Sequence, residues 1–176
     1  MSTTWKIDQS HSDVNFKVKH LMISTVTGKF ESYDGTVEQP NPDSFEGSAI
    51  SFTADVKSIS TGVADRDNHL RSNDFFNADE FPTMKFEASS FEKTSDDEYQ
   101  LNGHLTIRDN TKPVSLRATF NGITSDMWGG TRAGFEITGT IKRKEFGLLW
   151  NATTELGGVV VSDDVKLALD VQLVKQ

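Results

Sequence analysis

Apolar and polar residues alternate, one by one, along most of this chain. Residues 114–120 read Val-Ser-Leu-Arg-Ala-Thr-Phe, and residues 165–172 read Val-Lys-Leu-Ala-Leu-Asp-Val-Gln. Successive side chains of a β-strand point to opposite faces of the sheet, so a period of two predicts strands with one apolar and one wet face. Such strands are typical of antiparallel sheets, because parallel sheets are covered on both faces. The pattern therefore predicts an all-β, antiparallel protein.

The alternation marks eight candidate strands, and turn-forming residues lie between them. The candidates span residues 13–20, 26–37, 50–57, 84–89, 99–107, 114–120, 133–141 and 165–172. Along the second candidate the apolar phase slips by one residue near Ser32, which predicts a β-bulge.

Two segments interrupt the alternation. Residues 65–81 do not alternate, and we expect a short helical insert there. Asp65 or Asp67 is expected to cap this helix, and Pro82 to end it. Residues 144–161 alternate only briefly, so we interpret them as a long apolar loop near a barrel mouth.

A one-sided sheet must bury its apolar face, and closing the sheet on itself achieves this within one small domain. We expect a closed antiparallel β-barrel of about eight strands with one short helical insert, as a single domain over residues 1–176. Side chains fill a barrel of this size or leave room for one small ligand.

Small residues on the inward phase bear on this choice but leave both outcomes open. They either leave an elongated apolar cavity or offset the 12 phenylalanines in a core of normal density. They are Ala54, Ala88, Gly103, Ala118, Ala133 and Gly139.

Composition excludes several classes of function. A net charge of −8 argues against nucleic acid and against electrostatic binding to anionic membranes as partners. The absence of cysteine excludes disulfides, thiolate metal sites and thiol nucleophiles. The chain has no apolar stretch long enough to span a bilayer, and residues 1–6 do not resemble a signal peptide, which predicts a cytoplasmic location.

No motif for catalysis or metal binding is present. The histidines lack the spacings of a zinc site, Gly-x-Ser-x-Gly is absent, and no glycine-rich loop precedes a helix. We therefore expect no catalytic residue, no metal and no cofactor. Arg66, in the helical insert, either pairs with Asp67 to pin the insert to the barrel or serves as a polar gate for the head group of an amphiphile.

Several segments resemble the YceI-like family, in order and over nearly the whole chain. The most specific is Arg-Asp-Asn-His-Leu-Arg-Ser at 66–72, followed by Asp-Phe-Phe at 74–76 and Phe-Pro-Thr-Met-Lys-Phe at 81–86. The others lie at residues 11–20, 24–30, 103–108, 111–114, 146–148 and 161–165.

The resemblance implies a lipocalin-like barrel that binds a long isoprenoid amphiphile, such as a polyprenyl lipid or a quinone. Many members of the family are exported and some are linked to stress. We therefore expect a non-enzymatic protein that binds, sequesters or transports such a lipid. An enzyme for a small apolar substrate in the same cavity, and a stress-related structural module with a filled core, are the alternatives. The sequence leaves a homodimer open.

Most candidate ligand-binding residues follow from the inward phase of the strands. Arg66 and Phe76 come from the helical insert, and Trp150 is expected near a mouth. The full set is Phe16, Val18, His20, Phe30, Phe52, Arg66, Phe76, Met84, Phe86, Leu105, Leu116, Phe135, Ile137 and Trp150.

Overall fold

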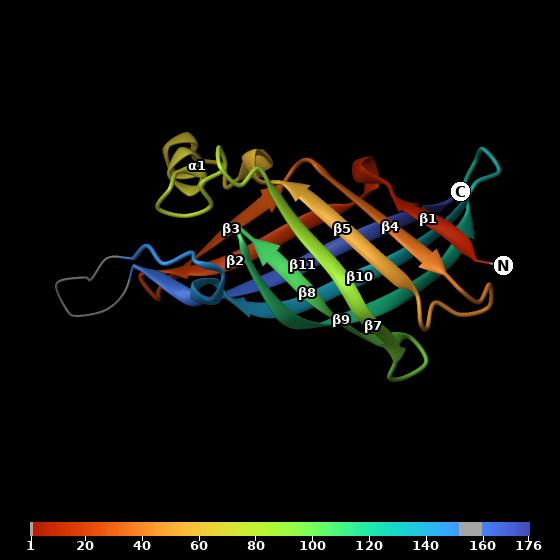
Figure 1. Ribbon diagram of the computed structural model, residues 1–176. Helices are drawn as coiled ribbons and strands as arrows, with labels where there is room; N and C mark the ends of the chain where they lie inside the picture. The colour runs from red at the N-terminus through yellow and green to blue at the C-terminus, as the bar shows by residue number, and fades with distance from the viewer. Residues whose placement is uncertain (1, 152–159) are drawn as a thin grey trace.

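The alternating segments form one antiparallel sheet that curls round and closes on itself (Figure 1). The computed structural model describes residues 2–151 and 160–176. Its strands are β1 (Thr3–Ile7), β2 (Asp13–His20), β3 (Ser24–Phe30), β4 (Tyr33–Gln39), β5 (Ala49–Asp55), β6 (Ile59–Ser60), β7 (Thr83–Lys93), β8 (Glu98–Ile107), β9 (Asn110–Ser125), β10 (Thr131–Lys142) and β11 (Val161–Lys175). Its helices are α1 (Ala64–Arg71) and the 3-10 turns η1 (Gln9–His11), η2 (Val56–Ser58) and η3 (Arg143–Phe146).

Three places in the barrel wall are each shared by two short strands. β1 and β2 together occupy the position beside β11. β3 and β4 occupy the next position, where β3 pairs with β2 and β4 pairs with β1. β5 and β6 occupy the third, where β5 pairs with β4 and β6 pairs with β3. Counted in this way the barrel has eight strands, and the pairing of β1 with β11 closes it. The prediction of a closed, eight-stranded antiparallel barrel with a helical insert is confirmed.

The first strand was not predicted, although it closes the barrel. β1 carries only two inward apolar residues, Trp5 and Ile7, which is too short an alternation to stand out in the sequence. The phase slip predicted near Ser32 is present, but as a complete break between β3 and β4. Phe30 and Tyr33 are both buried on either side of this break, so the apolar phase changes as expected.

The helical insert is shorter than predicted, and its predicted cap is wrong. α1 ends at Arg71, and turns lead from there to Pro82. The residue before the helix is Val63, which makes no side-chain capping bond. Asp67 lies inside the first turn, where its carboxylate accepts a hydrogen bond from the backbone of Thr61 at 2.8 Å.

Glycines on the barrel wall make room for large side chains of neighbouring strands. A Cβ added at Gly103 would lie 2.5 Å from the ring of Phe86, so the ring can lie flat against the wall only above a glycine. Gly139 lies under Leu116 in the same way, and Gly28 lies under Phe16. These small residues therefore serve the packing of their neighbours, and they keep bulky side chains against the wall.

An aromatic cluster closes the end of the barrel that lies near the chain termini. Phe45, from the loop between β4 and β5, is buried at its centre. Its ring centroid lies 5.4 Å from that of Trp5, 5.5 Å from that of Phe120 and 5.1 Å from that of Phe135. Aromatic pairs at such distances are attractive beyond the apolar area that they bury. We call this group the aromatic plug.

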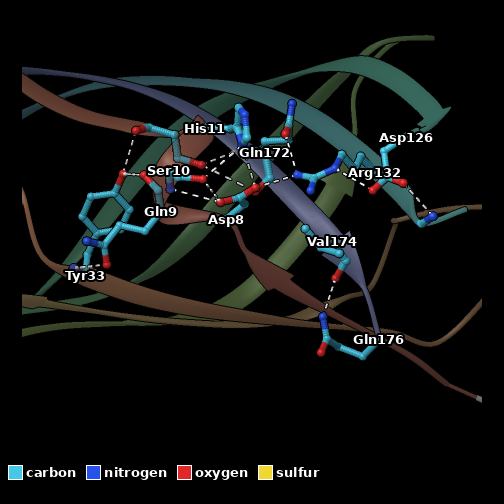
Figure 2. A network of polar contacts seen from close by, with 12 residues as sticks. Asp8, Gln9, Ser10, His11, Tyr33, Asp126, Arg132, Gln172, Val174 and Gln176 are labelled. Carbon is cyan, nitrogen blue, oxygen red and sulfur yellow. Dashed lines mark hydrogen bonds and ion pairs between the residues drawn. The ribbon is translucent and has the colours of Figure 1, made fainter. Parts of the chain in front are cut away.

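A polar network joins the segment between β1 and β2 to β10 and β11 (Figure 2). Arg132 of β10 donates to Asp8 at 2.6 Å and to the side chain of Gln172 at 2.7 Å, and it also pairs with Asp126 at 3.1 Å. The hydrogen bond from Arg132, joined by one from Ser10, holds the pKa of the Asp8 carboxyl well below its usual range. Asp8 therefore stays charged at a lower pH than an ordinary aspartate, and the network fixes the seam of the barrel.

Candidate functional site

An apolar cavity of about 230 Å³ runs along the inside of the barrel. Side chains of β1 to β5 and of β7 to β11 form its walls. Its described lining reaches from Phe45 and Phe91 at the plugged end to Phe76 and Arg143 at the other end. Among the described lining residues, Arg143 is the charged one. We call this cavity the lumen.

The lumen is recognisable from side chains that point inward yet are not fully buried. Residues of a solid core lose nearly all of their accessible surface, whereas these keep part of it. Because they line the cavity, their free surface faces the lumen rather than bulk solvent. They include Phe16, Val18, Phe52, Leu105, Val114, Leu116, Ile137, Val165, Leu167 and Leu169.

The size of the lumen suits a chain better than a bulky ring system. An engineered apolar cavity of about 150 Å³ stays dry and takes up benzene, and sites for drug-sized ligands start near 300 Å³. The lumen lies between these sizes and is elongated along the barrel. An apolar molecule inside it would replace empty space rather than ordered water, since nearly nothing on the wall can bind water.

The α1 segment and residues 147–151, which follow η3 and are called the loop after η3, frame the end opposite the plug. Leu70, Phe75 and Phe76 line the lumen from the α1 side. Trp150 stands behind them, with its ring centroid 5.4 Å from that of Phe75 and 4.8 Å from that of His69. We call this end the mouth of the barrel.

Arg143 is a buried cation at the mouth that sequence analysis missed. Its side chain is 3% exposed, and its guanidinium donates to four backbone carbonyls. These belong to Leu148 at 2.6 Å, Trp150 at 2.8 Å, Ser162 at 2.8 Å and Val161 at 3.2 Å. The side chain therefore ties the loop after η3 to the first residues of β11.

The charge of Arg143 has no carboxylate in direct contact among the described residues. Loss of hydration lowers the pKa of this guanidinium below its ordinary value, and the more distant Asp163 carboxylate offsets part of the effect. A guanidinium has five N–H donors, so most are already used by the carbonyls. The alternation itself would have placed Arg143 inward, two residues after Ile141, had it been followed beyond the predicted strand.

Most of the predicted ligand-binding residues lie on the lumen wall. Those that do are Phe16, Val18, Phe30, Phe52, Phe76, Met84, Phe86, Leu105, Leu116, Phe135 and Ile137. His20, Arg66 and Trp150 are not among the lining residues. Whether any of these residues contacts a ligand stays a prediction.

Arg66 is engaged by a neighbour rather than directed into the lumen. Its guanidinium donates to the hydroxyl of Thr61 at 2.7 Å and to the carbonyl of the same residue at 2.8 Å. Asp67 accepts from that hydroxyl at 2.5 Å. No ion pair joins Arg66 and Asp67 in the part of the chain that the structure describes, so the two residues hold the insert through Thr61 instead.

Ser10, His11 and Asp8 lie together but do not form a catalytic relay. Nδ1 of His11 lies 3.1 Å from the Ser10 hydroxyl and 2.8 Å from the Asp8 carboxylate. A relay needs one ring nitrogen for the nucleophile and the other for the acid, whereas here both partners meet the same nitrogen.

In the ranges 2–151 and 160–176, no cluster of three or more acidic or histidine ligands is placed to hold a metal. No helix of the described chain is long and apolar enough to cross a membrane.

Comparison with known proteins agrees with this architecture. The family model described as the YceI-like domain matches residues 5–173. Protein YceI of Salmonella newport is 39% identical over an alignment that covers 100% of this chain and 89% of that protein.

Two solved structures share the fold at low sequence identity. BcnA of Burkholderia cenocepacia superposes with a TM-score of 0.81 at 21% identity, covering 94% of this chain and 98% of that one. A polyisoprenoid binding domain from Saccharophagus degradans, implicated in plant cell wall breakdown, superposes with a TM-score of 0.72 at 14% identity. That match covers 96% of this chain and 97% of the other.

Proposed function

The chain belongs to the YceI-like family, and from this premise we propose that it binds the tail of a long isoprenoid-type lipid, a polyprenyl chain or a quinone, inside the barrel. The observation that carries the proposal is the lumen of about 230 Å³, with walls of partly exposed aliphatic and aromatic side chains. A fold shared with a polyisoprenoid binding domain supports it.

The energetics of such a site favour the tail over the head group. Each buried methylene contributes about 0.8 kcal/mol, so a chain of several isoprene units can supply most of the binding free energy. The aromatic plug closes one end of the lumen, so the tail would enter from the mouth and the head group would stay there. Selection of the head group is then loose, and tail length decides affinity.

The alternatives receive less support from the geometry. An enzyme acting on an apolar substrate needs converging polar groups, and the charged side chain on the described lumen wall, Arg143, already donates to four carbonyls. A structural module with a filled core would have no lumen. Transport as opposed to storage, a homodimer, a link to stress and a cytoplasmic location stay predictions.

The proposal is tested by titrating the protein with geraniol, farnesol and geranylgeraniol, which differ by one isoprene unit each. Affinity is expected to rise by about tenfold or more with each unit, because each unit buries further apolar carbon, until the lumen is full. Isothermal titration or displacement of a fluorescent fatty probe measures this. Affinities that do not change with tail length would contradict the proposal.

A further inference from the structure

Large apolar side chains are exposed at the turn between β2 and β3. Leu21 is 40% exposed, Met22 is 61% exposed and Ile23 is 85% exposed. Turns of this kind normally carry glycine, asparagine or aspartate, especially where φ is positive. Here Leu21 and Met22 have φ of 53° and 60°, so apolar residues are kept in a conformation that disfavours them. We call these three residues the apolar tip.

The apolar tip adjoins the mouth of the lumen. The N–H of Leu21 donates to the carbonyl of Val160 at 2.8 Å, and His20 pairs with Val161 across the strands. Val18 and Val161 both line the lumen. The wall of the lumen therefore continues into the tip, at the end of the barrel opposite the chain termini (Figure 1).

Lysines gather on the outer face of the same sheet, next to the tip. Lys17 of β2 stands directly opposite Lys166 of β11, and Lys19 follows two residues nearer the tip. All three side chains are exposed, and the described residues supply no ion pair to any of them. Like charges placed directly opposite one another destabilise a sheet, so this arrangement has a cost for folding.

Acidic residues occupy the other half of this outer face. Asp13 of β2 stands opposite Asp170 of β11, which in turn stands opposite Glu136 of β10. The protein as a whole carries a net charge of −8. Along the outer face of β2 and β11, however, Lys17 and Lys166 lie nearer the mouth than Asp13 and Asp170. The Asp163 carboxylate, also near the mouth, accepts from the backbone N–H of Lys144. Nearer the tip, Asp164 is paired with Lys142. This order would turn the mouth end toward a negatively charged surface and the far end away from it.

We propose that the mouth end docks on an anionic lipid bilayer, with the apolar tip in the interfacial layer and Lys17, Lys19 and Lys166 facing the head groups. Apolar side chains next to basic ones are the combination that holds peripheral proteins at such a surface. Docking in this orientation places the mouth of the lumen against the membrane, so a lipid tail can pass from one to the other with little exposure to water. The role in lipid exchange rests on the proposed function, whereas the docking itself does not.

Flotation with vesicles tests the docking. The wild-type protein is compared on phosphatidylcholine vesicles with and without phosphatidylglycerol, at low and high salt. One variant carries Leu21→Ser, Met22→Ser and Ile23→Ser, and a second carries Lys17→Gln, Lys19→Gln and Lys166→Gln. Each lysine near an anionic surface contributes about fivefold to partitioning, so the second variant is expected to bind roughly a hundredfold more weakly. The first variant should also lose most binding.

A matched control lies at the opposite end of the barrel. Met127 and Trp128, in the turn between β9 and β10, are 89% and 81% exposed, and Met127→Ser with Trp128→Ser should leave vesicle binding unchanged. The proposal is overturned if the wild-type protein does not float with phosphatidylglycerol vesicles, or if the control variant loses binding while both mouth variants keep it. Loss of self-association in the tip variant without any vesicle binding would identify a protein interface and would overturn it as well.

Titration with decylubiquinone in the absence of vesicles separates this proposal from the proposed function. Both mouth variants should bind this probe like the wild-type protein, because none of the altered residues lines the lumen. Probe binding without vesicle binding would defeat the docking alone. Vesicle binding without probe binding would defeat the proposed function alone.

Discussion

Replacing Val114 with tryptophan is expected to abolish uptake of an isoprenoid tail while leaving the barrel folded. Val114 lies on β9 opposite Gly103, and its half-buried side chain faces the lumen. An indole at this position would occupy space that the tail needs. Displacing several methylenes from the lumen should weaken farnesol binding by roughly a hundredfold.

The same variant also distinguishes a hollow barrel from a filled one. Forcing a larger side chain into a packed core costs about 1–3 kcal/mol, whereas an indole placed in open space costs little. We therefore expect the free energy of unfolding in urea to change by less than about 1 kcal/mol. Arg117→Trp, on the outer face of the same strand, is the matched control and should bind farnesol like the wild-type protein. Strong destabilisation by Val114→Trp would contradict a hollow interior.

Replacing Arg143 with methionine is expected to cause a large loss of stability. The substitution keeps an apolar stem of similar length but removes hydrogen bonds to four carbonyls. Leaving buried polar groups without partners costs about 1–3 kcal/mol each, and part of this is recovered by water at the mouth, so we expect a loss of roughly 3 kcal/mol. Urea unfolding measures the loss.

Hydrogen exchange shows where the effect of Arg143→Met lies. Protection should fall first in the loop after η3 and at the start of β11, which this side chain joins. Arg117→Met serves as control, because its ion pair with Glu98 at 3.9 Å is exposed and contributes little. Equal stability of the two variants would mean that Arg143 does not hold the mouth together.

The strand pattern was predictable because it is local. Residues 114–120 and 165–172 alternate without interruption, and period and exposure together define the inward face. The strand that closes the barrel, β1, was harder to predict, because only Trp5 and Ile7 carry the alternating pattern there. The plug could not be predicted, because Phe45 lies in a loop between polar residues and reaches Trp5, Phe120 and Phe135 only in the folded chain.

The hollow interior was also beyond the sequence, since it depends on where each side chain lies rather than on how large it is. Gly103 illustrates this, because its missing side chain is filled by the ring of Phe86 and not by the lumen. Arg66 shows a related limit for charged residues, whereas Arg143 could have been placed inward by following the alternation past Ile141. The more conspicuous Arg66 binds Thr61, while Arg143 follows the inward phase and lies at the mouth.

Extraction of the purified protein with organic solvent, followed by mass spectrometry of the extract, tests the central claim most directly. The claim is that the lumen holds a hydrocarbon tail. It predicts a lipid with a polyprenyl or quinone tail, close to one molecule per barrel in the wild-type protein and in Arg117→Trp, and much less in Val114→Trp. Repeated preparations that yield no such lipid, or equal amounts from all three proteins, would contradict it.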